Sequence, residues 1–179
     1  ETNRMSQLVH DLLDLAHLEG ESYPINKEPV ILAEILKEVI DRFQLELKEK
    51  NMQVLFDLDE DVVVNGDQER LDQVIVNLVS NAIKYSQANH ELKLSVFTYG
   101  ETGVLKVEDS GIGIPEKDLP YIFNRFYRVD KARTRKNGGT GLGLSIVQQI
   151  VKRHDGEVKI ESELGKGTVV EVKIPLFKF

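Results

Sequence analysis

Two asparagines and a lysine recur at helical spacing near the middle of the chain. Asn77, Asn81 and Lys84 are four and three residues apart, so a helix places them on one face. Amide oxygens suit Mg²⁺, a hard cation that prefers oxygen ligands, and an ammonium group suits phosphate oxygens. A solvated polar face gives the same pattern, so this segment alone leaves both interpretations open.

A glycine-rich segment, Gly138 to Gly143, leads directly into another predicted helix. Glycines let the backbone approach an anion closely, and a helix N-terminus offers free N–H groups. Leu144 stands where a P-loop has its lysine, and no strand directly precedes the segment, so Walker and Rossmann motifs are excluded. The pattern predicts phosphate binding, with a flexible glycine hinge as the alternative.

A third motif, formed by Asp109, Gly111 and Gly113, directly follows a predicted strand. Asp-Gly turns are common after strands, so by itself the pattern favours an ordinary turn. An aspartate at a strand end can also accept a hydrogen bond from an adenine amino group. The two glycines would then turn the chain tightly beneath the base.

Alternating strands and helices must position these residues. Strands are predicted over 25–30, 52–58, 62–64, 92–99, 104–108, 157–163 and 168–175, with hairpins at 100–103 and 165–167. Helices are predicted over 32–50, 67–86 and 141–154, and short helical turns over 117–126. Asp67 is the expected N-cap of the second helix, and Gly156 the left-handed cap after the third. The order predicts an α/β sandwich in which helices cover one face of a mixed sheet.

An amphipathic helix is predicted at residues 1–19, where Met5, Leu8, Leu12 and Leu15 form an apolar stripe. Residues 20–24 are typical of a linker. We therefore expect this helix to pack against a partner helix, and packing on its own domain is the alternative.

Composition narrows the function classes. The 179 residues carry a net charge of -7, which argues against a dedicated nucleic-acid binder, and the lack of cysteine excludes disulfides and thiolate metal sites. No apolar run approaches the roughly 20 residues that span a bilayer, so we expect the chain itself to be soluble. One basic stretch comprises Arg125, Arg128, Lys131, Arg133, Arg135 and Lys136. A cationic lid over a polyphosphate explains this stretch better than a nucleic-acid patch does.

Together the motifs resemble the catalytic ATP-binding domain of bacterial sensor histidine kinases over residues 25–176. The segment 67–86 is similar to that family's N box, 109–113 to its G1 box, 139–144 to its G2 box, 122–128 to its F box and 165–168 to its last glycine motif. The resemblance implies the Bergerat, or GHKL, fold, a two-layer α/β sandwich that binds ATP with Mg²⁺. It also implies a division into the end of the second dimerisation helix (1–20), a linker with the first strand (21–29) and the catalytic domain (30–179).

The resemblance implies roles for individual residues. Asn81 would be the main Mg²⁺ ligand, with Asn77 assisting, and Lys84 and Arg128 would contact phosphate as further catalytic groups. Asp109 would recognise adenine by a hydrogen bond. The other implied nucleotide-binding residues are Tyr85, Gly111, Gly113, Ile114, Phe123, Phe126, Tyr127, Gly139, Thr140, Gly141, Leu142, Gly143, Leu144 and Thr168, the last acting through water.

Position 77 distinguishes subfamilies. Related ATPases carry a glutamate there as general base, whereas the neutral amide of Asn77 cannot take a proton, which favours phosphoryl transfer over hydrolysis. The resemblance thus implies transfer of the ATP γ-phosphate to a histidine in two-component signalling. A GHKL-fold ATPase or serine kinase, and a non-catalytic nucleotide-sensing module, are the alternatives.

The chain's own histidines are His10, His17, His90 and His154, and none lies in an acceptor motif. We interpret them as helix-end or surface residues and expect no autophosphorylation by this chain. The resemblance implies four partners: ATP, a domain bearing the acceptor histidine, a response-regulator receiver domain and a second copy in the full-length protein. It also implies a cytoplasmic domain of a phosphoprotein held in the bacterial cell membrane, with no nucleic-acid partner.

Overall fold

The computed structural model describes residues 2–20, 24–129 and 139–179. Its helices are α1 (Thr2–Glu19), α2 (Leu32–Arg42), α3 (Gln44–Glu49), α4 (Gln68–Tyr85), the short 3₁₀ helix η1 (Leu119–Tyr121) and α5 (Gly143–Arg153). Its strands are β1 (Glu28–Ile31), β2 (Gln53–Leu58), β3 (Val63–Gly66), β4 (Glu91–Tyr99), β5 (Thr102–Asp109), β6 (Glu157–Glu163) and β7 (Gly167–Pro175).

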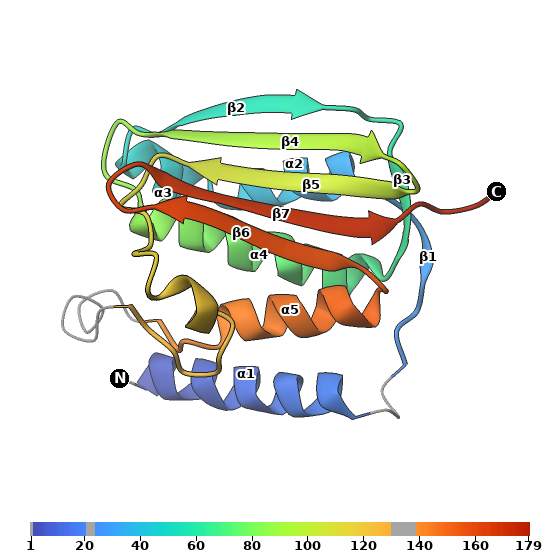
Figure 1. The fold of residues 1–179 in the computed structure, drawn as a ribbon, viewed down its shortest axis with the longest axis horizontal. Coiled ribbons are helices and arrows are strands. Elements are labelled where there is room, and N and C mark those ends of the chain that lie inside the picture. The colour runs from blue at the N-terminus through green and yellow to red at the C-terminus, as the bar shows by residue number, and fades with distance from the viewer. Residues whose placement is uncertain (1, 21–23, 130–138) are drawn as a thin grey trace.

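Within these ranges the main sheet has five strands in the order β2-β4-β5-β7-β6. β2 runs parallel to β4, and the remaining pairs are antiparallel. Helices α2, α4 and α5 lie against one face of this sheet, and β1 pairs with β3 in a small separate sheet (Figure 1). The predicted two-layer sandwich with a mixed sheet is confirmed.

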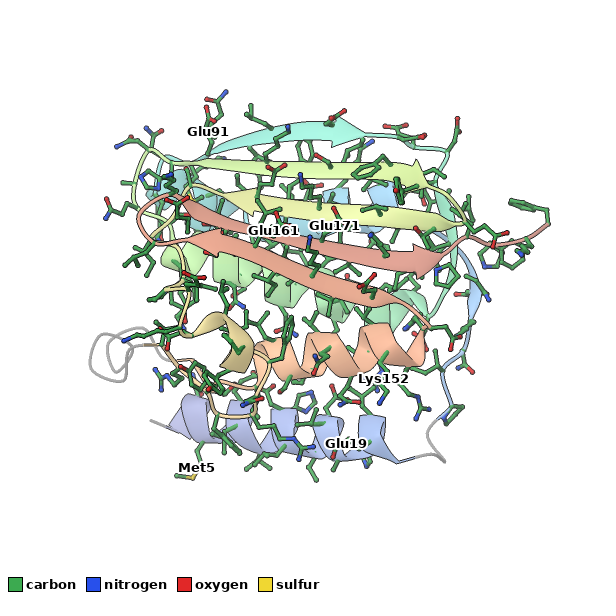
Figure 2. The ribbon with its side chains drawn as sticks, viewed as in Figure 1. Met5, Glu19, Glu91, Lys152, Glu161 and Glu171 are labelled. Atoms are coloured by element: carbon green, nitrogen blue, oxygen red, sulfur yellow. The ribbon has the colours of Figure 1, made fainter. Side chains whose placement is uncertain are left out.

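The two faces of the sheet differ in polarity because side chains alternate along each strand. Leu92 and Leu94 of β4 point to the helices and are fully buried. On the opposite face, Glu161 and Glu171 stand among other charged side chains (Figure 2), and Glu171 pairs with Lys173 at 3.3 Å. One face of the sheet therefore packs the core while the other meets water.

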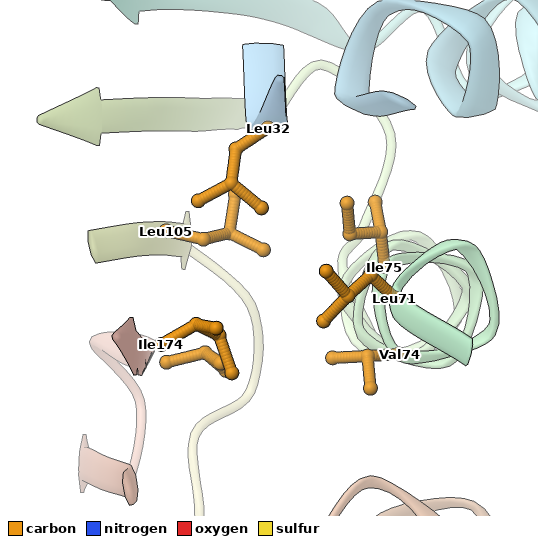
Figure 3. A pocket seen from close by; sticks show the side chains of 7 residues that line it. Leu32, Leu71, Val74, Ile75, Leu105 and Ile174 are labelled. Atoms are coloured by element: carbon orange, nitrogen blue, oxygen red, sulfur yellow. The ribbon is translucent and has the colours of Figure 1, made fainter. Parts of the chain in front are cut away.

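A small gap remains between α4 and the sheet (Figure 3). Its volume is about 10 Å³, barely enough to hold one water molecule. Only apolar side chains line it: Leu32, Leu71, Val74, Ile75, Leu105, Val172 and Ile174. It is a packing gap in the core and lies apart from the polar residues that could bind a ligand.

Two local predictions were wrong, whereas η1 confirms a short helix within 117–126. The predicted helix 32–50 breaks at Phe43, which ends α2 and begins α3. The left-handed residue after α5 is Asp155, with φ +56°, in place of Gly156. Asp155 tolerates this conformation as a short polar residue and pairs with Lys27 at 2.6 Å. Gly156 is required for space, because a Cβ there would overlap the carbonyl oxygen of Lys173.

Helix α1 packs along α5 on its own domain (Figure 1), and the expected partner helix stays a prediction. Leu15 and Leu18 are buried, whereas Met5 is 70% exposed at the far end (Figure 2) and Leu12 is also exposed. The predicted stripe is therefore only partly the packed face. None of the helices in the described part of the chain combines the length and apolar character needed to cross a bilayer.

Polar contacts explain this rotation of α1. Asp14 Oδ1 accepts a hydrogen bond from Arg70 Nη1 of α4 at 2.7 Å, and both side chains are largely buried. Arg153 Nη1 of α5 donates to the carbonyl oxygen of Gly20 at 3.0 Å. These contacts turn the acidic side of α1 toward the domain and leave apolar side chains such as Met5 and Leu12 exposed.

Candidate functional site

The polar face of α4 carries Asn77, Asn81 and Lys84, all half-buried. The helix begins as predicted, with the Asp67 carboxylate accepting a hydrogen bond from the Arg70 N–H at 3.1 Å. Its apolar face is buried against the sheet and α5, which fixes the rotation of the helix. The three polar side chains are thereby held at the edge of the core, where they remain partly open to solvent.

The glycine-rich loop passes along this polar face. A methyl group on Gly143 would lie 3.3 Å from Asn77 Oδ1, and one on Gly139 would lie 2.6 Å from Lys84 Nζ. The loop backbone thus lies close to the amide and the ammonium group. Segments more than fifty residues apart meet here, as the sequence predicted.

Helix α5 starts at the end of this loop. Leu142 is its N-cap and is fully buried, so its side chain belongs to the core, while Leu144 is half-buried. The first N–H groups of a helix have no partner inside it and carry the positive end of its dipole. The loop and α5 therefore form an anion-binding element opposite Asn77 and Lys84. Gly138 lies outside the described residues.

Asp109 ends β5 and faces the helix layer, directly opposite Thr168 of β7. Gly111 N–H donates to Asp109 Oδ1 at 2.8 Å. Burial raises the pKa of Asp109, while the N–H groups of Gly111 and Thr168 and the charge of His90 act in the opposite direction. The carboxyl group is thus a half-buried acceptor at the end of the sheet.

The turn after Asp109 closes onto the end of α4. Ile112 N–H donates to the carbonyl oxygen of Tyr85 at 3.1 Å, and a Cβ on Gly111 would lie 2.6 Å from that same oxygen. Gly113 has φ +70°, and a Cβ there would overlap the carbonyl oxygen of Glu163. Both glycines are therefore needed for close packing, which brings the aspartate turn beside the asparagine helix.

The segment 122–128 is attached to the glycine loop. Phe126 N–H donates to the carbonyl oxygen of Gly141 at 2.9 Å, and both residues have positive φ, +61° and +76°. Phe126 is exposed, whereas Phe123 is half-buried. The Tyr127 hydroxyl donates to the buried carboxylate of Asp118. This segment forms the described base of the predicted lid.

Cationic groups gather beside Tyr85. Burial raises the pKa of Tyr85, and the guanidinium of Arg128 opposes this shift. Lys84 Nζ lies 5.3 Å from the centre of the tyrosine ring. The corner between α4 and the lid base is therefore positively charged, which suits a polyphosphate. The basic residues predicted at 131–136 lie outside the described residues.

Helix α1 contacts the glycine loop, which the sequence did not predict. Thr140 Oγ1 donates to Asp11 Oδ2 at 2.9 Å and accepts a hydrogen bond from the Leu142 N–H at 3.3 Å. Arg125 of the lid base forms an ion pair with Glu19. No signal in the sequence pointed to these pairs, because their members are far apart along the chain.

His154 is another residue whose role was missed. It is fully buried, so the surface interpretation was wrong, although it does stand at the end of α5. His154 Nε2 accepts a hydrogen bond from the Asp67 N–H at 2.9 Å. Burial lowers the pKa of His154. The side chain ties the end of α5 to the start of the asparagine helix.

Oxygen donors for a cation come from α4. Among the described residues, no group of three or more acidic or histidine side chains is placed to hold a metal ion. The amide oxygens of Asn77 and Asn81, one helical turn apart, are the candidates for Mg²⁺. They would act together with phosphate oxygens and water, as is usual for this ion.

Comparison with known proteins matches residues 66–178 to the family described as histidine kinase-, DNA gyrase B-, and HSP90-like ATPases. Sensor histidine kinase WalK of Bacillus subtilis (strain 168) is 43% identical over 178 residues, which cover 98% of this chain and 29% of WalK. The chain spans less than a third of the length of the first curated relatives that it matches.

Two solved structures show the same architecture. Histidine kinase ThkA in complex with response regulator protein TrrA aligns with a TM-score of 0.80 and 27% identity, over 99% of this chain and 48% of that chain. Full-length ShkA in complex with AMPPNP aligns with a TM-score of 0.83 and 25% identity, over 97% of this chain and 36% of that chain.

Proposed function

Because the chain belongs to the family of histidine kinase-, DNA gyrase B-, and HSP90-like ATPases, we propose that it transfers the γ-phosphate of ATP to a histidine on a separate dimerisation domain. The chain is an ATP-binding domain of the sensor histidine kinase type, because it is 43% identical to WalK over 98% of its own length. Phosphoryl transfer, its acceptor and its partners are the proposal, since the chain spans 29% of that relative.

The residues present fit a magnesium-bound triphosphate. Glycines at 139 and 143 let the loop backbone lie beside Lys84 and Asn77, the side chains that would hold a phosphate chain and its Mg²⁺. Amide oxygens of Asn77 and Asn81 supply the hard donors that Mg²⁺ prefers. When bound, the ion would neutralise charge on the phosphates and polarise the γ-phosphoryl group.

The remaining site residues would orient the nucleotide. Lys84 and Arg128 would hold phosphate oxygens, and the N-terminus of α5 would add backbone donors. Asp109 would accept a hydrogen bond from the adenine amino group, with Thr168 beside it. Catalysis by this arrangement rests on positioning and on charge neutralisation, which is the usual requirement of phosphoryl transfer.

One observation favours transfer over hydrolysis. The side chain that meets the glycine loop at Gly143 is the neutral amide of Asn77, whose Oδ1 would lie 3.3 Å from a methyl group there. An amide cannot remove a proton from water, so water attack gains no general base at this position. A positioned nucleophile such as a histidine on another domain needs no such base.

A labelling experiment tests the proposal. The chain is mixed with γ-labelled ATP, Mg²⁺ and a separate dimerisation domain that bears an acceptor histidine. Label that is acid-labile and alkali-stable on that domain is the expected result. Absence of transfer to a folded acceptor would overturn the kinase proposal, and rapid phosphate release would instead support the ATPase alternative. ATP binding without either outcome would support the nucleotide-sensing alternative.

Further partners follow from the same proposal. The solved complex of ThkA with a response regulator supports a receiver domain as the next acceptor. A second copy of the parent protein, its own phosphorylation and its place in the bacterial membrane stay predictions. The division at residues 20 and 30 and the roles of the remaining nucleotide-binding residues also stay predictions.

A further inference from the structure

Three polar side chains form one row across the end of the sheet. Asp109 of β5 is the direct partner of Thr168 in β7, which is in turn the partner of Ser162 in β6. Direct partners in antiparallel strands project from the same face. Val107 and Val170, two residues along each strand, belong to the core, so this row also faces the helices. All three side chains are half-buried.

Ser162 lies at the outer end of this row and has three hydrogen-bond partners. Its Oγ lies 2.8 Å from each of three atoms: Ile114 N, the carbonyl oxygen of Gly167 and Thr168 Oγ1. The Ile114 N–H can only donate, and the Gly167 carbonyl can only accept. A serine hydroxyl has one proton and two lone pairs.

All three contacts are hydrogen bonds in one arrangement only. Ser162 must donate its single proton to Gly167, because that carbonyl has none to give. The two lone pairs then accept from Ile114 N–H and from the Thr168 hydroxyl. Since the proton of Thr168 is used on Ser162, its oxygen has only lone pairs left for the nucleotide side.

We propose that Ser162 is a positioning residue that fixes Thr168 Oγ1 as an acceptor and so makes the site select 6-amino purines over 6-oxo purines. The inference rests on the proposed function, in which Asp109 and Thr168 face the base, and it gives Thr168 a direct contact with the base in place of the contact through water that the resemblance implies. Adenine carries an amino donor at position 6, whereas guanine carries a carbonyl acceptor there. Two fixed acceptors, Asp109 and Thr168, complement adenine and leave the guanine oxygen without a donor.

Binding of MgATP and MgGTP to the whole chain, measured by calorimetry, tests this inference. In Ser162→Ala the Thr168 hydroxyl can rotate and donate to a 6-oxo group. We expect the ratio of ATP affinity to GTP affinity to fall about tenfold, the effect of one hydrogen bond. Ser162→Thr retains the hydroxyl and should keep the wild-type ratio, which makes it the matched control.

A second variant separates selection from structure. In Thr168→Val the hydroxyl is gone, so adding Ser162→Ala to it should leave the ATP to GTP ratio unchanged if Ser162 acts through Thr168. A purely structural role of Ser162 would weaken both nucleotides equally and leave the ratio at its wild-type value, which overturns the inference. Wild-type chain that binds neither nucleotide would overturn the proposed function itself.

Discussion

His154 joins the end of α5 to the start of α4, the helix that carries both asparagines. Its ring accepts a hydrogen bond from the Asp67 N–H at 2.9 Å, and Nδ1 lies 2.7 Å from the carbonyl oxygen of Ile150. A carbonyl only accepts and an N–H only donates, so the ring is neutral with its proton on Nδ1. Substitution of His154 by leucine removes both bonds while keeping a similar side-chain volume.

We expect His154→Leu to lower the free energy of unfolding by about 2 kcal/mol near neutral pH. Each lost hydrogen bond contributes about 1 kcal/mol net. The unpaired Asp67 N–H adds a desolvation cost, which the larger apolar surface of leucine partly offsets. The variant should still bind ATP under conditions in which it is folded, because His154 lies outside the nucleotide contacts.

The effect of His154→Leu should depend on pH. Burial, the largest effect, lowers the pKa of His154 from 6.5; the hydrogen bond to Ile150 opposes it, the charge of Lys27 adds to it, and the charges of Asp67 and Asp155 oppose it more weakly. As the pH falls through 6.5, the unfolded chain takes up a proton that the folded chain does not. The contribution of His154 to the wild-type free energy of unfolding is therefore complete above pH 6.5. Below that pH it decreases by at most about 1.4 kcal/mol per pH unit.

Urea denaturation of wild type and His154→Leu above and below pH 6.5 measures the difference between their free energies of unfolding. The difference should narrow as the pH falls, because leucine has no proton to gain. His10→Leu makes the same change of side chain at an exposed position on α1 and is the matched control. A His154→Leu difference that stays constant or widens in acid would refute the buried neutral ring.

Three further substitutions test the site and its supports. Asp109→Asn should weaken ATP binding about tenfold by calorimetry. The variant should not be less stable near neutral pH, because burial raises the pKa of Asp109 and the ionised carboxylate is therefore unfavourable in the folded protein. Unchanged affinity for ATP would contradict the adenine role of Asp109. Gly167→Ala should lower the free energy of unfolding by more than about 3 kcal/mol, because φ is +122° and a Cβ would overlap the Asp109 carbonyl oxygen. Its control, Gly165→Ala, lies in open space and should lower it by about 1 kcal/mol. Equal losses in the two variants would argue against the clash. Lys50→Met removes a 2.8 Å hydrogen bond to the Ser86 carbonyl oxygen at the end of α4 and should lower the free energy of unfolding by about 1 kcal/mol in urea denaturation. Lys50→Arg, which keeps a donor, should be closer to wild type in stability.

Local signals made much of the fold predictable. Asp67 was recognisable as an N-cap because its carboxylate bonds an N–H three residues away. The two hairpins were recognisable because glycine-containing turns separate alternating strands, β4 from β5 and β6 from β7. The glycine loop and the asparagine face could also be predicted, since each motif is contiguous or follows helical spacing.

Long-range contacts explain most of what the sequence did not predict. Asp11 and Thr140 are 129 residues apart, so nothing local indicates that α1 touches the glycine loop. His154 and Asp67 are 87 residues apart, so no local pattern distinguishes this histidine from any other residue at a helix end. Asp155 takes the left-handed conformation and pairs with Lys27, which is 128 residues away.

The fate of the γ-phosphate tests the central claim most directly. Wild-type chain, Asn77→Glu and its neutral control Asn77→Gln are each given labelled ATP, Mg²⁺ and an acceptor domain, and label on histidine is compared with free phosphate. We predict that wild type places most label on histidine and that Asn77→Glu raises phosphate release about a hundredfold by adding a general base, while Asn77→Gln does not. Wild-type chain that releases phosphate as fast as Asn77→Glu would contradict the account.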